Sequence, residues 1–157
     1  MRAFLAAAIL AAPALASAGD PTCQGRLSGT VTGTFTCDAA VVESKDGEAT
    51  FVVQARDPIP GVPAYAPGAF RLPRPVRAGT YTLDDLGMGK ASVAAEGGTL
   101  FTATKTTGLR GEVLLTIRSA ARDPKTPGAW IVHGTYRARL VPAGDGKQGE
   151  VIVEASF

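Results

Sequence analysis

Apolar and polar residues alternate strictly in two segments near the end of the printed sequence, residues 130–140 and 150–157, which are joined by turn-forming residues at 142–149. A period of two, rather than the helical 3.6, predicts two β-strands that each have one buried and one solvated face. Matching the two apolar faces places Leu140 beside Val151 and Arg137 beside Glu154. A slip of one residue would mix the faces, so the pattern predicts the register as well as the strands.

The same alternation recurs in shorter segments between turn-forming residues. The further predicted strands are 39–43, 48–56, 79–83, 90–95, 99–104 and 112–120. Proline interrupts the segment 57–75 repeatedly, and proline cannot donate a ladder hydrogen bond, so this segment is predicted as a long surface loop with a short edge strand at 69–72. A total of about eight to ten strands joined mostly by tight turns is expected, so strands adjacent in sequence should lie next to each other in space. This predicts a single all-β domain, either an antiparallel β-sandwich or a closed up-and-down barrel.

The first 18 residues have the pattern of a secretory signal peptide. Arg2 is followed by a short apolar run and by the small residues Ala16, Ser17 and Ala18. This order predicts cleavage after Ala18 and a secreted β-domain at 19–157. The apolar run is shorter than the ~20 residues that span a bilayer, so no transmembrane helix is expected in the mature chain. The protein is expected in the periplasm or outside the cell.

The two cysteines, Cys23 and Cys37, lie in one alternating segment. A single extended strand would hold them roughly 45 Å apart, beyond bonding reach. Either the bond is absent or the chain reverses, and a reversal centred on Thr30, with Gly29 and Gly33 beside it, would set the cysteines opposite each other. Because secreted proteins fold in an oxidising compartment, a disulfide is the expectation.

Charge and residue types exclude several functions. The 16 basic and 14 acidic residues nearly cancel and form no basic run, which argues against a nucleic-acid surface. No nucleophile stands in a recognisable setting beside the single histidine, His133, so no catalytic residue and no enzyme is predicted; a hydrolase using His133 is a minor alternative. One histidine and two cysteines do not make a zinc site. Asp84, Asp85 and the segments 87–92 and 145–150 are interpreted as turns, not as ligand loops.

Four large aromatic residues are the candidates for a ligand-facing core. They are Phe51, Phe101, Trp130 and Tyr136. If they line a barrel cavity, the protein would carry a small apolar ligand. The terminal Phe157 is similar to the end of an outer-membrane β-barrel, but aromatic residues are 6% of the chain and form no paired girdles, so that alternative ranks lower.

Several glycine- and threonine-rich segments resemble families of uncharacterised secreted bacterial β-domains. These segments are 23–37, 79–83, 133–136 and 155–157. The resemblance implies a small extracytoplasmic sandwich or barrel and supplies no activity, cofactor or catalytic residue. The expected function is a non-enzymatic binding or structural module of the cell envelope, with an envelope protein or a small apolar ligand as its partner.

Overall fold

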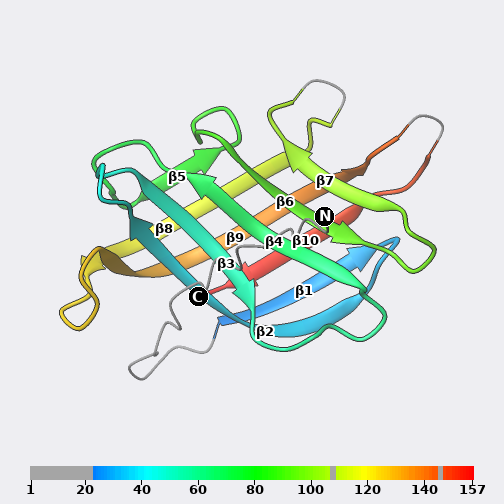
Figure 1. Ribbon diagram of the computed structural model, residues 1–157, viewed down its shortest axis with the longest axis horizontal. Helices are drawn as coiled ribbons and strands as arrows, with labels where there is room; N and C mark the ends of the chain where they lie inside the picture. The colour runs from blue at the N-terminus through cyan, green and yellow to red at the C-terminus, as the bar shows by residue number, and fades with distance from the viewer. Residues whose placement is uncertain (1–22, 107–108, 145–146) are drawn as a thin grey trace, which may run out of the picture.

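The computed structural model describes residues 23–106, 109–144 and 147–157, and within these ranges the chain forms ten β-strands and no helix (Figure 1). The predicted signal peptide and the Asp145–Gly146 pair lie outside the described residues. The strands are β1 Cys23–Gly29, β2 Gly33–Glu43, β3 Ala49–Ala55, β4 Ala64–Arg71, β5 Gly79–Thr82, β6 Gly89–Ala94, β7 Leu100–Thr104, β8 Glu112–Arg122, β9 Ala129–Pro142 and β10 Val151–Ser156.

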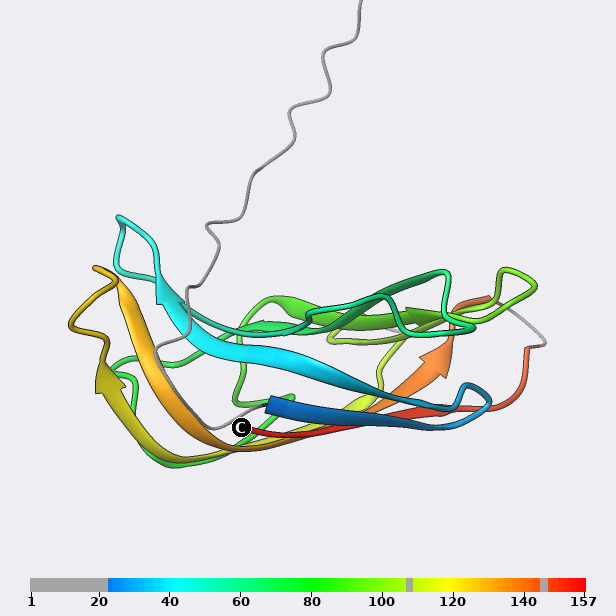
Figure 2. The same ribbon diagram turned by 90° about the horizontal axis from the view of Figure 1, so that it is seen from below.

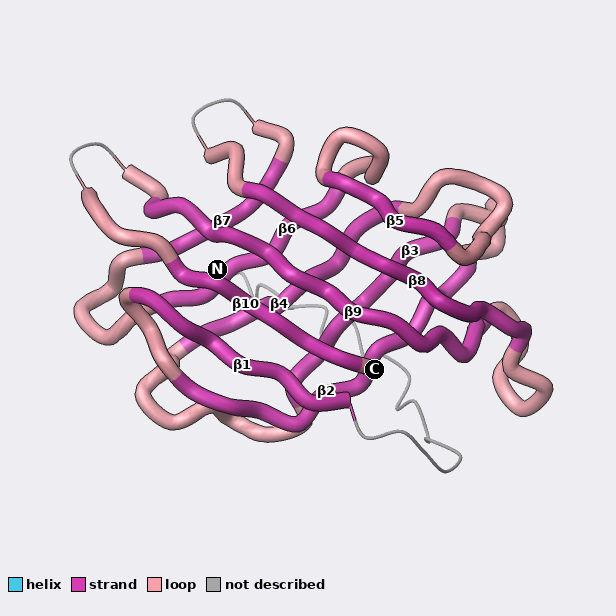
Figure 3. The backbone as a smooth tube through the Cα atoms, turned by 180° about the vertical axis from the view of Figure 1, so that it is seen from behind, coloured by secondary structure: helices cyan, strands magenta, loops and turns pink. Residues whose placement is uncertain are grey.

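Eight strands close into an antiparallel barrel, which confirms the predicted fold class. The order is β10-β1-β2-β3-β4-β6-β7-β9, and β9 pairs back with β10. Strands β8 and β5 extend the wall outward from β9. Viewed from the side, the barrel is flattened into two facing walls (Figure 2). The view from behind shows β1, β10, β9, β8 and β5 crossing one wall side by side (Figure 3).

The register of the closing hairpin is the predicted one. Val151 pairs with Leu140, and Glu154 pairs with Arg137. Val153 is fully buried, as the alternation requires, whereas Arg137 is exposed. The even-numbered residues of β9 and the odd-numbered residues of β10 therefore face the core, and the residues between them face solvent.

The disulfide is also confirmed. The chain reverses between β1 and β2, where Gly29 adopts a φ of +98°, a conformation that favours glycine. The reversal places Cys23 opposite Cys37, and the two are bonded. Both cysteines face the core, which encloses them almost completely.

The prediction that residues 57–75 form a surface loop, with a short edge strand at 69–72, is wrong in part. Strand β4 runs from Ala64 to Arg71 and lies inside the sheet between β3 and β6. Its proline is tolerated because the register with β6 shifts between Ala66 and Ala69, and Pro67 falls at this irregularity. No ladder hydrogen bond needs the N–H that Pro67 lacks.

The expectation that strands adjacent in sequence pair with each other fails at β5. This strand pairs with β8 on the outer edge, not with β6. The connection from β5 to β6 buries Leu83 and Leu86 in the core, at 4% and 0% exposure. Because these two leucines are buried in the core, the turn after β5 does not fold β6 back onto β5 as a hairpin.

Candidate functional site

Three of the four predicted core aromatics lie inside the barrel. Phe51, Phe101 and Tyr136 are each at most 1% exposed. The rings of Phe51 and Tyr136 lie 5.8 Å apart, and Phe70 and Phe157 join them at centroid distances of 6.4 Å from Tyr136 and 5.3 Å from Phe51. These aromatic side chains pack against each other and occupy the interior between the walls.

Trp130 is placed apart from that cluster. It is half-buried at the start of β9, and the Arg122 guanidinium lies 4.4 Å from its ring centroid. The carboxylate of Glu43 pairs with Arg122, so Trp130 belongs to a cation–π and ion-pair group. Within the described part of the chain its indole N–H has no hydrogen-bond partner.

His133 is half-buried in β9, where its register partner across the sheet is Ser119. Between the described residues, no group of three or more histidine, cysteine, aspartate or glutamate side chains is placed to hold a metal ion. The turn interpretation of Asp85 is supported, because its carboxylate accepts hydrogen bonds from the Thr82 N–H and hydroxyl, each at 2.8 Å. The bond from the Thr82 N–H is the main cause that lowers the pKa of Asp85.

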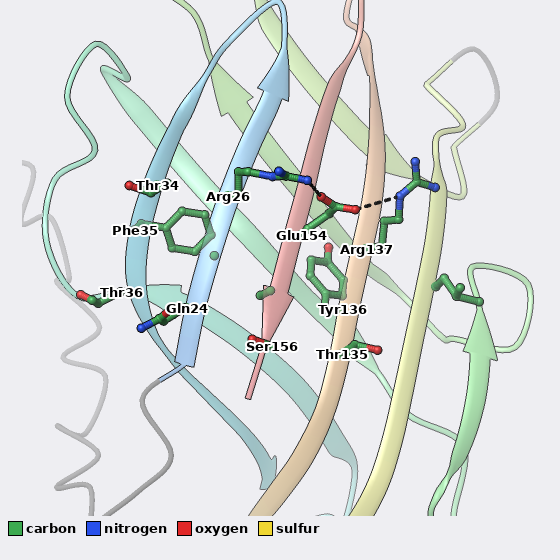
Figure 4. Close-up of a pocket in the computed structure, with 13 residues that line it drawn as sticks. Gln24, Arg26, Thr34, Phe35, Thr36, Thr135, Tyr136, Arg137, Glu154 and Ser156 are labelled. Atoms are coloured by element: carbon green, nitrogen blue, oxygen red, sulfur yellow. Dashed lines mark hydrogen bonds and ion pairs between the residues drawn. The ribbon is translucent and has the colours of Figure 1, made fainter.

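A groove of about 910 Å³ crosses the solvent face of β2, β1, β10, β9 and β8 (Figure 4). We call it the outer-face groove. Its outward-facing side chains come from the positions that alternate with the core and are mostly polar, and the core residues Phe35 and Tyr136 also contribute to its lining. The groove is therefore built by the same alternation that builds the barrel interior.

Two rows of outward-facing residues run across the strands in register. The hydroxyl row joins Thr36, Gln24, Ser156, Thr135, Thr116 and Thr80. The charged row joins Thr34, Arg26, Glu154, Arg137, Leu114 and Thr82. The first row holds only neutral hydrogen-bonding groups on six strands. The second row lies two residues along each strand and adds a cluster of charges.

Glu154 lies at the centre of the charged row between two arginines. The Arg26 Nη2 lies 2.6 Å from one carboxylate oxygen, and the Arg137 Nε lies 3.5 Å from the other. The hydrogen bond from Arg26 is the main cause that lowers the pKa of Glu154. The side chains of Arg26 and Arg137 stay 66% and 53% exposed, so both guanidinium groups keep donors that face solvent.

A second hollow, of about 340 Å³, continues from the first toward β5. Leu114 and Arg137 line both hollows. Leu114 is 46% exposed and is the apolar residue of the charged row. Beyond it, Arg110 pairs with Asp84 at the far end of the second hollow.

Only part of this surface is predicted by the sequence. The alternation predicts the pairing of Arg137 with Glu154, but no ligand-binding role is assigned to the pair. Nothing in the pattern predicts that Arg26 joins the pair, or that Gln24 lies in one row with Thr135. The available signal was the run of polar residues that alternates with the core positions of residues 23–37.

Comparisons with known proteins find no family model, no curated protein and no solved structure that matches this chain. Within the described residues, no helix is long and apolar enough to cross a membrane. The outer-face groove must therefore be interpreted from its own chemistry.

Proposed function

We propose that this protein is a non-enzymatic binding module of the cell envelope and that the outer-face groove is its ligand surface. The observation that supports this most directly is the hydroxyl row, in which six neutral hydrogen-bonding side chains from six strands line up on one face. Five of them are exposed and Thr116 is half-buried. Four of the six line the groove, namely Thr36, Gln24, Ser156 and Thr135. Convergent polar groups in a concave surface are typical of a binding site.

The disulfide supports an extracytoplasmic location. Disulfides persist in secreted and periplasmic proteins, whereas cytosolic thiols are kept reduced. The bond between Cys23 and Cys37 and the signal-peptide pattern in the sequence point to the same compartment.

The carrier hypothesis receives less support. A ligand carried in the barrel would need the space in which the rings of Phe51, Phe70 and Tyr136 now pack. The outer-membrane hypothesis also receives less support, because the outward positions of β1, β9 and β10 hold the charged groups of Arg26, Arg137 and Glu154. A lipid-facing surface would place apolar residues there.

Retention by envelope material tests the proposed function. The purified protein is mixed with cell-envelope fragments from its own host, the fragments are sedimented, and the bound fraction is measured. Gln24→Leu, which removes the hydrogen-bonding amide at nearly unchanged volume, is expected to weaken retention. Gln54→Leu is the matched control, because Gln54 is an exposed amide on β3 outside the groove. Equal retention of the two variants would refute the proposed ligand surface.

A further inference from the structure

The outer-face groove combines two kinds of chemistry, and together they indicate a class of ligand. Resting on the proposed function, we propose that the groove binds an extended polysaccharide that carries carboxylate groups. The hydroxyl row would contact sugar hydroxyls and the arginines of the charged row would contact the carboxylates. Each part of this assignment follows from a separate property of the groove.

The hydroxyl row matches a ligand that is itself rich in hydroxyl groups. Threonine and serine hydroxyls both donate and accept, and the Gln24 amide does the same with separate atoms. Only Thr80 and Thr116 share a bond along the row, with their hydroxyl oxygens 3.3 Å apart. In the part of the chain that the structure describes, the side chains of Gln24, Thr135 and Ser156 form no side-chain hydrogen bond, so they are free to contact a ligand.

The charged row provides sites for carboxylates. Arg26 and Arg137 flank β10, so their strands are two strand spacings, about 10 Å, apart. Each arginine uses one nitrogen to hold Glu154, Nη2 in Arg26 and Nε in Arg137. The remaining N–H groups are held outward in a planar fork, the arrangement that binds carboxylates. Because Glu154 offsets one of the two positive charges, the row does not form the extended basic surface that nucleic acid needs.

The length of the groove indicates a polymer. The groove crosses five strands, and four spacings of about 4.8 Å give it a length of roughly 19 Å. A single sugar would cover a small part of this length. Leu114, exposed in the middle of the path between the two hollows, offers an apolar contact for the C–H face of a sugar ring.

An acidic peptide fits the groove less well. Extended peptides are bound mainly through backbone hydrogen bonds to a free strand edge. Strands β1, β10 and β9 are paired on both sides and offer only side chains toward the groove. The groove therefore favours a ligand whose own hydrogen-bonding groups lie along its whole length.

Titration calorimetry with three polymers tests the ligand class. The probes are polygalacturonate, uncharged dextran and poly-glutamate, each added to the intact protein at low salt. Polygalacturonate is expected to bind at least about tenfold more tightly than either of the others, since a charge-assisted hydrogen bond and a hydroxyl contact each add to affinity. If dextran binds as tightly as polygalacturonate, the arginines do not contribute to affinity. If poly-glutamate binds as tightly as polygalacturonate, the hydroxyl row does not contribute.

Two variants with matched controls locate the binding. Arg137→Gln and Gln24→Ala are expected to weaken polygalacturonate binding, the first by about tenfold or more. Arg118→Gln and Gln54→Ala change an exposed arginine and an exposed amide outside the groove and are expected to leave affinity unchanged. Equal losses in a variant and its control would overturn the proposal.

The same measurements separate the two proposals. If no polysaccharide binds, yet Gln24→Leu still weakens retention by envelope fragments, the ligand class is wrong and the proposed function stands. If polysaccharide binding and retention are both unaffected by the groove variants, both proposals fail.

Discussion

The hydroxyl of Tyr136 on β9 donates a hydrogen bond to the backbone carbonyl of Pro67 on β4, at 2.8 Å. The bond crosses the interior and joins the two walls of the barrel at the irregularity in β4. Burial raises the pKa of Tyr136 far above its ordinary value, so the hydroxyl remains a donor. Gly68 makes room for this contact, because a Cβ atom there would lie 2.6 Å from the tyrosine oxygen.

Tyr136→Phe is expected to lower the free energy of unfolding by about 1–3 kcal/mol, because it leaves the buried Pro67 carbonyl without its donor. Urea denaturation followed by tryptophan fluorescence measures the change. Tyr65→Phe is the control, since the Tyr65 hydroxyl donates to the Asp57 carbonyl at a more exposed site. Equal effects of the two substitutions would show that the hydrogen bond across the barrel contributes no more to the free energy of unfolding than the more exposed one.

Gly25→Ala is expected to destabilise the protein by about 1–3 kcal/mol through overpacking. Its Cβ atom would lie 2.1 Å from the Phe35 ring, which is 8% exposed and packed in the core. In a Phe35→Leu background the same change is expected to cost less, which a double-mutant cycle measures. Gly79→Ala is the matched control on a strand, because its nearest contact would be an ordinary 3.7 Å. Additive effects at positions 25 and 35 would contradict the packing argument.

Replacing both Cys23 and Cys37 by alanine is expected to lower stability by about 3 kcal/mol, because the bond restricts a loop of this size in the unfolded chain. Denaturation curves of the wild-type protein and of the variant, each measured with and without a reducing agent, test this expectation. Reduction should destabilise the wild-type protein by a similar amount and leave the variant unchanged. A wild-type curve that does not respond to complete reduction would show that the sheet alone maintains the β1–β2 hairpin.

Stability is expected to fall in acid. Hydrogen bonds hold the pKa values of Asp85, Asp123 and Glu154 below their ordinary range. Because the folded-state pKa is the lower one, each carboxylate adds stability above its ordinary pKa, and this contribution is lost as the pH falls through the folded-state value. The urea midpoint should therefore decrease steadily from about pH 5 downward. Glu154→Gln should make this decrease smaller.

The control for the acid series is Glu96→Gln, at an exposed turn position. It should follow the wild-type curve at every pH. If Glu154→Gln also follows that curve, the pairing of Glu154 with Arg26 and Arg137 contributes nothing to the pH dependence of folding.

The predicted hairpins were correct because their determinants are local. In both the β1–β2 and β9–β10 hairpins a short connection brings two alternating segments together, and only one register matches their apolar faces. The opposed cysteines and the pairing of Arg137 with Glu154 follow from that register. The strand at 64–71 was not predicted as an interior strand, because a proline such as Pro67 is typical of a strand break. Only the pairing of β4 with strands on both sides shows that Pro67 falls at an irregularity.

Only parts of the outer-face groove could be predicted from the sequence. Alternation predicts that Gln24, Thr36 and Thr135 face solvent, each on its own strand. Their alignment in one row depends on β10 pairing with both β1 and β9, and Thr80 joins the row only because β5 pairs with β8. The second of these pairings contradicts the expectation drawn from sequence order.

By itself, the sequence determined the positions of most strands, the face of each strand that enters the core, and the registers of the two hairpins, because period-two alternation and short connections act over a few residues. Only the tertiary structure decided the closure of the barrel, the place of β5 and the assembly of the groove. Pairing between distant strands depends on which edges remain free and on how buried side chains such as Leu86 and Tyr136 fill the space between the walls, and these quantities exist only once the whole chain has folded.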